Sequence, residues 1–393
     1  MKPKILTSAL FLLPFVVTTF NVQALVALYM SESMAQVVAY GMIGLVILGI
    51  FFSLKNIGRL SKTAGLWIGF YMAYFAFGTT ASIVKGYEFN FLVSLIPVIY
   101  FFGFYIYLSK QENRWLFKNV ALFSYVVSSI VCIFLFKINW DLDHRGIYIY
   151  KIERAGGLLG DANNAALVAV VAFIFVYKLY NPTKKILKHL KLVLLLATFY
   201  CLVITFSTTG YFVFIVSFTM LNLKYFTPKR MLLVILLIPV LFVTLINLNN
   251  LTAGLNLSTQ QRAKVSNIVN LVTFNTQEVD NSGRGELLEN LLVYVYKNPF
   301  LGNGIDFAKD LRGHNTVVGV WADAGIFALL IFLVMLGNYF RKAIIAPPDK
   351  RYFALSILVV LCIFMLTLQT VINQEYLIAL FVYVGYVLDE NSF

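Results

Sequence analysis

Residues 35–54 read AQVVAYGMIGLVILGIFFSL, a stretch that contains no charged residue. About 20 consecutive apolar residues are the length that an α-helix needs to cross the hydrocarbon core of a bilayer. Glu32 precedes the stretch, whereas Lys55, Arg59 and Lys62 follow it. Because lysine and arginine accumulate in cytoplasmic loops, the stretch predicts a transmembrane helix that ends at the cytoplasmic side.

The rest of the chain has the same character. Of its 393 residues, 60% are apolar and 12% are charged, against about 45–50% and about 25% in a soluble domain. This composition excludes a soluble enzyme, a disordered protein, a coiled coil and a secreted disulfide scaffold. We therefore predict an all-α integral membrane protein that forms a single polytopic domain over residues 1–393.

Apolar runs predict about twelve transmembrane helices. The expected spans are residues 5–30, 35–54, 64–84, 90–108, 115–136, 163–180, 187–206, 209–223, 231–247, 314–338, 353–372 and 374–389. Every second loop is basic and the intervening short loops are nearly uncharged, so both termini are expected in the cytoplasm. The first run also resembles a signal peptide, with Val22-Gln23-Ala24 as a cleavage site, but it is long for that role.

The net charge of +13 does not indicate a nucleic-acid-binding protein. The basic residues are scattered through short loops, where they orient the spans, and we expect no nucleic-acid partner. Cys132, Cys201 and Cys362 lie inside apolar runs, there is no Cys-x-x-Cys spacing, and the histidines are far apart. We therefore expect no metal ligation by cysteine and no local zinc motif.

Two predicted outer loops are long, at residues 137–163 and 248–313. Connections longer than about 12–15 residues are usually functional or disordered. The second loop holds apolar residues at helical spacing over 265–272 and again over 288–295, and Pro299 ends the second of these patterns. We expect two amphipathic helices there, lying along the membrane surface.

The first long loop contains candidate residues for binding an anion. Residues 151–166 read KIERAGGLLGDANNAA. Arg154 carries a bidentate fork suited to phosphate, Gly157 lets backbone N–H groups approach a ligand, and a helix start near Asn163 offers free N–H donors. The alternative is that Arg154 is an interfacial anchor and the glycines form only a turn.

The second long loop contributes an arginine and a histidine. Arg284 lies at an expected helix N-terminus, where its charge is disfavoured unless an anion is present. His314, followed by Asn315, lies at the outer mouth of the tenth span, where an imidazole can accept a proton from a hydroxyl. Asp323 lies inside that span and is a functional candidate by default, or else a structural partner of a neighbouring helix.

The order of these motifs resembles the superfamily of O-antigen ligases and Wzy-type O-antigen polymerases of bacterial envelopes. Arg-x-Gly-Gly and Gly-Asp-Ala-Asn precede a span in the first loop. Gly-Arg, Asn-Pro-Phe-Leu-Gly-Asn-Gly (298–304), His-Asn and Ala-Asp-Ala-Gly (322–325) follow in the second part of the chain. The motifs cover residues 154–166 and 282–327.

The resemblance implies a GT-C-like, inverting, metal-independent glycosyltransferase at the periplasmic face of the bacterial inner membrane. Its donor is an undecaprenyl-diphosphate-linked oligosaccharide, it needs no cofactor, and the family usually works with a chain-length-regulating co-polymerase. Carried over by motif, Arg284 holds the donor diphosphate and His314 positions or deprotonates the acceptor hydroxyl. Arg154 matches an outer-loop arginine, and Gly157, Asn163 and Asn315 are expected beside the substrate.

One departure bears on the choice between polymerase and ligase. Ligases and some polymerases carry an arginine in a Ser/Thr-x-Ser/Thr-Arg stretch at the outer start of a middle span. Here residues 205–210 read TFSTTG, and Thr209 stands in that place. This favours a polymerase of lipid-linked repeat units over a ligase that transfers glycan to lipid A–core, unless Arg154 replaces the missing cation. A twelve-span transporter or flippase is a further alternative, although such proteins place polar segments near the bilayer midplane.

Overall fold

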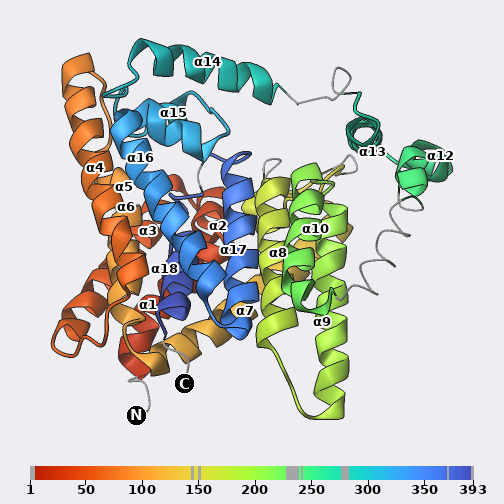
Figure 1. Cartoon of the computed structure of the whole chain (residues 1–393), viewed down its shortest axis with the longest axis horizontal. Helices are drawn as coiled ribbons and strands as arrows, with labels where there is room; N and C mark the ends of the chain where they lie inside the picture. The colour runs from red at the N-terminus through yellow and green to blue at the C-terminus, as the bar shows by residue number, and fades with distance from the viewer. Residues whose placement is uncertain are drawn as a thin grey trace. The chain divides into compact units, whose positions relative to one another are not determined.

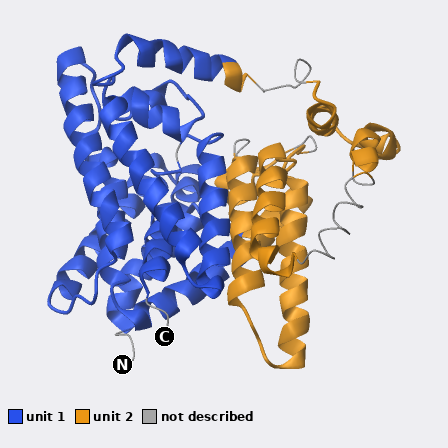
Figure 2. Ribbon diagram, in the orientation of Figure 1, with its two compact units in different colours: residues 1–128, 286–393 blue, residues 129–285 orange. Residues whose placement is uncertain are grey.

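The computed structural model describes residues 5–142, 146–148, 152–226, 239, 242–275, 283–369 and 371–390. These residues divide into two compact units (Figure 2), residues 1–128 with 286–393 (unit 1) and residues 129–285 (unit 2). The boundaries fall inside helix α7 (Gln111–Lys137) and after the second residue of helix α14 (Arg284–Lys297). Lys151, Ser282 and most of the predicted ninth span, residues 231–247, lie outside the described residues.

The regular secondary structure of unit 1, over its described residues, consists of helices (Figure 1). Besides the parts of α7 and α14 that belong to it, its helices are α1 (Ile5–Thr19), α2 (Val22–Tyr29), α3 (Glu32–Leu54), α4 (Lys62–Lys85), α5 (Phe91–Ser94), α6 (Ile96–Tyr107), α15 (Phe307–Asp310), α16 (Thr316–Ile345), α17 (Pro348–Met365) and α18 (Glu375–Asp389). Helix α18 is apolar all round and buried over nearly its whole length, as expected of a central helix. Helix α16 packs along α4, with the rings of Phe70 and Phe332 4.9 Å apart.

Unit 2 is built around one buried helix. Its elements are β1 (Trp140–Asp141), β2 (Gly146–Ile147), a 3₁₀ turn (Gly157–Leu159), α8 (Ala162–Leu179), α9 (Lys185–Ile204), α10 (Thr208–Asn222), a second 3₁₀ turn (Leu223–Tyr225), α12 (Leu248–Thr252) and α13 (Thr259–Val272). Helix α8 packs on α9 and α10 and is buried along most of its length. The two short strands pair antiparallel, Trp140 opposite Ile147, and add a small ribbon to an otherwise helical fold.

Several of these helices can cross a membrane. Six are long and apolar enough, namely α3, α4, α7, α8, α9 and α16, and the pair α1–α2, bent by 62°, makes a seventh if counted as one span. Helices α10 and α18 have 15 residues each, or about 22 Å of rise, short of the roughly 30 Å hydrocarbon core. The chain is thus a multi-pass helical membrane protein, and the count of about twelve spans stays a prediction.

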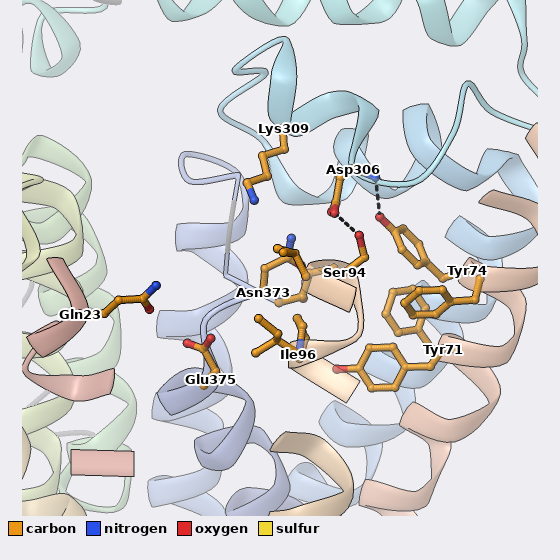
Figure 3. Close-up of a pocket in the computed structure, with 14 residues that line it drawn as sticks. Gln23, Tyr71, Tyr74, Ser94, Ile96, Asp306, Lys309, Asn373 and Glu375 are labelled. Carbon is orange, nitrogen blue, oxygen red and sulfur yellow. Dashed lines mark hydrogen bonds between the residues drawn. The ribbon is translucent and has the colours of Figure 1, made fainter. Parts of the chain in front are cut away.

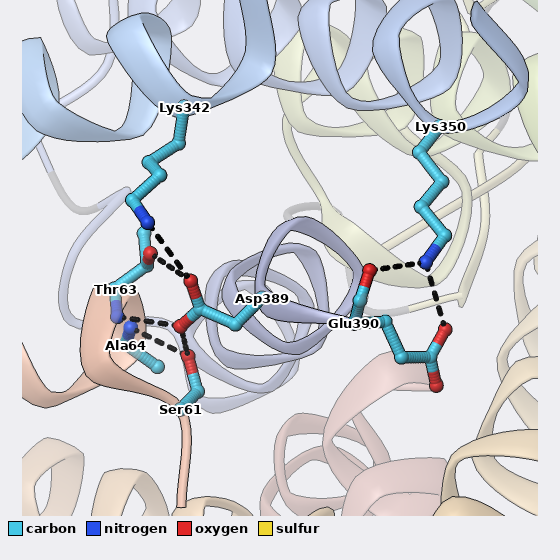
Figure 4. Close-up of polar contacts among 7 residues, drawn as sticks. All are labelled: Ser61, Thr63, Ala64, Lys342, Lys350, Asp389 and Glu390. Carbon is cyan, nitrogen blue, oxygen red and sulfur yellow. Dashed lines mark hydrogen bonds and ion pairs between the residues drawn. The ribbon is translucent and has the colours of Figure 1, made fainter. Parts of the chain in front are cut away.

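A polar cluster joins segments that the charge pattern assigns to the cytoplasmic side (Figure 4). The carboxylate of Asp389 at the end of α18 accepts hydrogen bonds from Ser61 Oγ at 2.7 Å and from Thr63 N at 2.8 Å, just before and within the first turn of α4. Glu390 pairs with Arg114 at 2.8 Å and with Lys350 at 3.6 Å. The ends of unit 1 that are predicted to lie on one side therefore do meet.

Candidate functional site

The first long loop is held against the connection between α9 and α10. The backbone N–H of Ala155 donates to the carbonyl of Ile204 at 3.0 Å, and Arg154 Nε donates to the carbonyl of Thr205, also at 3.0 Å. Phe206, the next residue, adopts a left-handed backbone with φ 48°, which turns the chain into α10. The guanidinium of Arg154 is therefore fixed at the start of α10, in the stretch that contains Thr209.

The N-terminus of α8 is capped by a carboxylate of the chain itself. The Asp161 carboxylate caps the helix by accepting from the N–H groups of Asn163 at 3.1 Å and Asn164 at 2.9 Å. The expectation of free N–H donors at this helix start is therefore wrong, because the aspartate that precedes the helix occupies them. An aspartate directly before an apolar run is an N-cap signature, so the sequence did contain the signal.

Gly157 and Asn163, both expected beside the substrate, are packed inside unit 2. Gly157 has φ 55°, and a Cβ there would lie 2.8 Å from Cys132 Cβ. The side chain of Asn163 is 3% exposed, and its Oδ1 accepts from Ser207 Oγ at 2.8 Å. Ser207 in turn caps α10 by accepting from Gly210 N. These contacts join the starts of α8 and α10, and a role of either residue in binding substrate stays a prediction.

Arg154 is half-buried, and its electrostatic surroundings are unbalanced. Burial lowers the pKa of Arg154; the Asp161 carboxylate opposes this change, and the positive charge of Arg284 adds to it. An arginine keeps its proton under all these influences. Burial and the positive charge of Arg284 both disfavour the charged form of Arg154, so an anion bound near Arg154 would be stabilising.

Arg284 is the first residue of α14, as the sequence pattern predicted. Gly283 before it has φ 72°, a left-handed conformation that favours glycine. Within the part of the chain that the structure describes, the Arg284 guanidinium makes no hydrogen bond or ion pair. An unpaired cation at the positive end of a helix dipole again favours an anionic ligand.

His314 lies in unit 1, in a turn just before α16. Its backbone is left-handed, with φ 46°, and its side chain is half-buried. Gly313 packs against Leu291 of α14, so closely that a Cβ would lie 2.4 Å from Leu291 Cδ2. Asn315 Oδ1 caps α16 by accepting from Val318 N at 3.0 Å. The turn that carries His314 therefore lies between α14 and α16. Asn315 stabilises the start of α16.

The two remaining motifs of the second part of the chain pack on each other. Helix α16 is broken at Gly325, whose φ is 76°, and a Cβ there would lie 2.0 Å from the carbonyl oxygen of Phe300. The N–H of Ile326 donates to Pro299 O at 2.9 Å, and the N–H of Asn303 donates to Ala322 O at 2.8 Å. Residues 298–304 therefore fill the break in α16 and complete its backbone hydrogen bonds.

Asp323 is buried and serves as a structural partner. Its carboxylate accepts from Tyr74 Oη at 2.8 Å and from Ala308 N at 2.7 Å. These two bonds tie α4, α15 and α16 together. Of the two roles considered for Asp323, its contacts support the structural one.

Unit 1 also contains a cavity of about 230 Å³ that the sequence did not indicate (Figure 3). A second, smaller cavity shares Tyr74, Asp306 and Lys309 with its lining and includes Asp323, and we call this smaller cavity the side lobe. The polar lining of the larger cavity comes from five separate stretches of unit 1, namely Gln23, Tyr74, Ser94, the pair Asp306 and Lys309, and the pair Asn373 and Glu375. No single stretch carries enough of these groups to be noticed in the sequence.

The described residues contain no group of three or more histidine, cysteine, aspartate or glutamate side chains arranged to hold a metal ion. Arg154 belongs to unit 2 and His314 to unit 1, with the cavity in the same unit as His314. Unit 2 can thus offer cations to an anion, and unit 1 can offer an imidazole to a hydroxyl and a polar cavity to a third group.

The fold defines the class as a multi-pass helical membrane protein. Residues 192–333, which are 142 of the 393 residues, match the family model described as O-antigen ligase. The match confirms the predicted resemblance to the O-antigen ligase and polymerase superfamily, in the part of the chain that holds Arg284 and His314 but not Arg154. No curated protein matches the chain. Members of this family are glycosyltransferase-like enzymes, and the family points to lipid-linked glycans as substrates.

Proposed function

We propose that the protein is a polymerase of lipid-linked oligosaccharide repeat units of an O-antigen or a related surface polysaccharide. It transfers a glycan from an undecaprenyl-diphosphate donor to a lipid-linked repeat-unit acceptor at the periplasmic face of the inner membrane. The observation that carries the proposal is the match of residues 192–333, which include Arg284 and His314, to the O-antigen ligase family, in a chain whose outer-loop Arg154 is fixed on the carbonyl of Thr205.

The reaction is a displacement at the anomeric carbon of the donor. The acceptor hydroxyl oxygen forms a bond to C1 from the face opposite the diphosphate, the bond between C1 and the phosphate oxygen breaks, and undecaprenyl diphosphate leaves with both electrons. His314 takes the hydroxyl proton. Negative charge grows on the leaving oxygen, so arginine forks aimed there stabilise the transition state more than the ground state.

The polymerase assignment over a ligase rests on Thr209. Where ligases of this superfamily carry an arginine at the outer start of a middle span, this chain has a threonine in the first turn of α10. Arg154 donates to the carbonyl of Thr205 four residues earlier, so it can supply a cation at the same turn. This contact provides the cation that a ligase would need, and it keeps the ligase as an alternative.

A ligase that transfers glycan to lipid A–core is the second candidate. The family match favours it by its description, which is that of an O-antigen ligase. The two candidates use the same donor and the same leaving group and differ only in the acceptor. The acceptor is therefore what an experiment must vary.

The test uses purified full-length protein in detergent, a synthetic undecaprenyl-diphosphate repeat unit and EDTA, with products separated by size. We expect a ladder of glycans that continues to form with EDTA and is absent for Arg284→Ala and His314→Ala. A single product that appears only after lipid A–core is added would establish a ligase instead. Absence of any transfer with either acceptor would reject glycosyl transfer and leave the transporter alternative.

A further inference from the structure

The cavity beside Asp323 has the composition of a sugar-binding site. Its walls combine the aromatic rings of Phe70, Tyr74 and Phe75 with carboxyl, amide and hydroxyl groups. A mostly apolar and aromatic wall with a few placed polar groups is the usual design of a small-molecule site. The volume of about 230 Å³ corresponds to roughly seven or eight waters at ~30 Å³ each, which suits one sugar ring better than a long glycan.

Several polar groups in the cavity have hydrogen-bonding capacity to spare. The Nε2 atom of Gln369, in the side lobe, is buried and has no hydrogen-bond partner among the described residues. Lys309 and Asn373 also make no side-chain hydrogen bond within the described part of the chain, and Lys309 points down into the cavity (Figure 3). A buried donor without a partner is costly, and a ligand hydroxyl would remove that cost.

The charges of the lining select among ligands. Asp306 and Glu375 place two carboxyl groups around the cavity, against the single ammonium of Lys309. An excess of carboxyl groups disfavours a diphosphate or a uronic acid, whereas carboxylates form strong charge-assisted hydrogen bonds with neutral hydroxyl groups. This separates the cavity in chemical type from the arginine pair that suits the diphosphate.

The position of the cavity connects it with the acceptor. Thr316, which lines the side lobe, follows His314 by two residues, and its Oγ1 is fixed by a 2.6 Å bond to Leu368 O. On the proposed function, His314 accepts the proton of the acceptor hydroxyl. Thr316 therefore connects the side lobe, within two residues of the chain, to the residue that would accept this proton.

We infer that this cavity is the subsite for the acceptor sugar, and that the sugar is neutral or basic rather than acidic. Asp306 and Glu375 accept hydrogen bonds from its hydroxyl groups, and Gln369 and Asn373 donate to its oxygens. The identification of this sugar as the acceptor rests on the proposed function. The binding of a neutral sugar to the cavity, by contrast, can be measured without any reaction.

The first experiment measures binding by saturation-transfer-difference NMR on the full-length protein in detergent. The probes are the methyl glycosides of glucose, galactose, mannose, N-acetylglucosamine and glucuronic acid. We expect at least one uncharged glycoside to give signals and the glucuronide to give none. Signals from the glucuronide equal to those of the best uncharged probe, or no signal from any probe, would overturn the inference.

The variants for this measurement are Asp306→Asn and Glu375→Gln, which keep size and polarity. Asparagine tolerates the left-handed backbone of residue 306, where φ is 61°, so the turn should fold. The matched control is Asp310→Asn, because Asp310 ends the short helix α15 that Asp306 precedes, is exposed, and accepts a hydrogen bond from Tyr87 outside the cavity. Signals should weaken in the first two variants and persist in the control; unchanged signals in all three would contradict the inference.

A second experiment separates the cavity from the reaction. A fluorescent repeat unit on a short soluble aglycone serves as acceptor, with donor saturating. We expect Asp306→Asn and Glu375→Gln each to raise the acceptor KM about tenfold, because each variant loses roughly one charge-assisted hydrogen bond. The kcat should change less than twofold, and inhibition by undecaprenyl diphosphate should not change. If the wild-type protein binds sugar but transfers none, the proposed function is rejected and the sugar site remains. If the wild-type protein elongates the acceptor but the two variants have an unchanged acceptor KM, the subsite is rejected and the proposed function remains.

Discussion

His314 joins a reactive group to an unusual backbone. Its left-handed φ of 46° is uncommon for a residue other than glycine, asparagine or aspartate. A substitution that respects this conformation can therefore separate chemistry from folding. Asparagine is the natural choice, because it adopts the same backbone but cannot act as a base near neutral pH.

We predict that His314→Asn lowers the rate of chain elongation by about 10²-fold or more, the usual contribution of general-base catalysis. The thermal midpoint of the purified protein should change little. The measurement is the ladder assay together with thermal unfolding in detergent. Elongation at more than half of the wild-type rate would remove His314 from the mechanism, and a large fall in the midpoint would show that its turn is primarily structural.

Arg154 is fixed by one nitrogen and leaves the others for a ligand. Arg154→Lys keeps the charge but loses the fork that bonds Thr205 O and that, on the proposed function, would bond a phosphate at the same time. We predict at least about a tenfold fall in elongation rate. The control is Arg262→Lys, since Arg262 also bonds backbone carbonyls in unit 2 but is exposed. Equal rates in the two variants would refute a specific role for Arg154.

Single residues were predictable from sequence where the signal is local. The first residue of α14 followed from the apolar spacing after Arg284 and from the stop at Pro299. The cavity was not predictable, because Ser94, Asp306 and Glu375 come from three segments that only the packing of unit 1 brings together. Helical periodicity reports the face that a residue occupies but not the neighbouring segment that it meets.

Helix α16 shows how an element can depend on a loop. The break at Gly325 is filled by residues 299–303, and Gly302 is required on the other side of the contact, where a Cβ would lie 2.4 Å from Asp323 O. The sequence presented these glycines as parts of a family motif and gave no means to pair them. Their pairing shapes the wall of the cavity, because Asp306 follows directly in the chain.

We predict that Gly325→Ala destabilises the protein by about 2–4 kcal/mol, since it adds both backbone strain at positive φ and a clash with Phe300 O. The matched control is Gly337→Ala in the same helix, where nothing lies within 4 Å and alanine is the better helix former. Thermal unfolding in detergent should show a midpoint several degrees lower for the first variant and unchanged or higher for the second. Equal midpoints would mean that the contact with residues 299–303 is not rigid.

On the scale of the whole molecule, the charge pattern and the packing of unit 1 agree. Segments predicted on the cytoplasmic side meet around Asp389 and Glu390. Segments predicted on the outer side, including residues 302–313 and 373–375, meet around the cavity. Packing alone does not say which group faces the cytoplasm; the excess of lysine and arginine makes that assignment.

This assignment predicts the outcome of cysteine labelling in intact cells. After the three native cysteines are replaced by alanine, Asp310→Cys and Glu289→Cys should react with a membrane-impermeant maleimide, because both positions are exposed and predicted to be periplasmic. Lys55→Cys, also exposed, should react only after the membrane is opened. The reverse pattern would invert the topology and move the proposed site to the cytoplasm.

The bond between Arg154 Nε and Thr205 O also bears on how tightly a donor can be held. With Nε engaged by the backbone, the two terminal nitrogens form a planar edge whose direction is set before any ligand arrives. An arginine that must be ordered on binding loses about 0.5–1.5 kcal/mol of side-chain freedom, and most of that loss here occurs during folding. On the proposed function, the diphosphate would meet a preorganised receptor, so its discrimination against a monophosphate would be a matter of geometry rather than of charge alone.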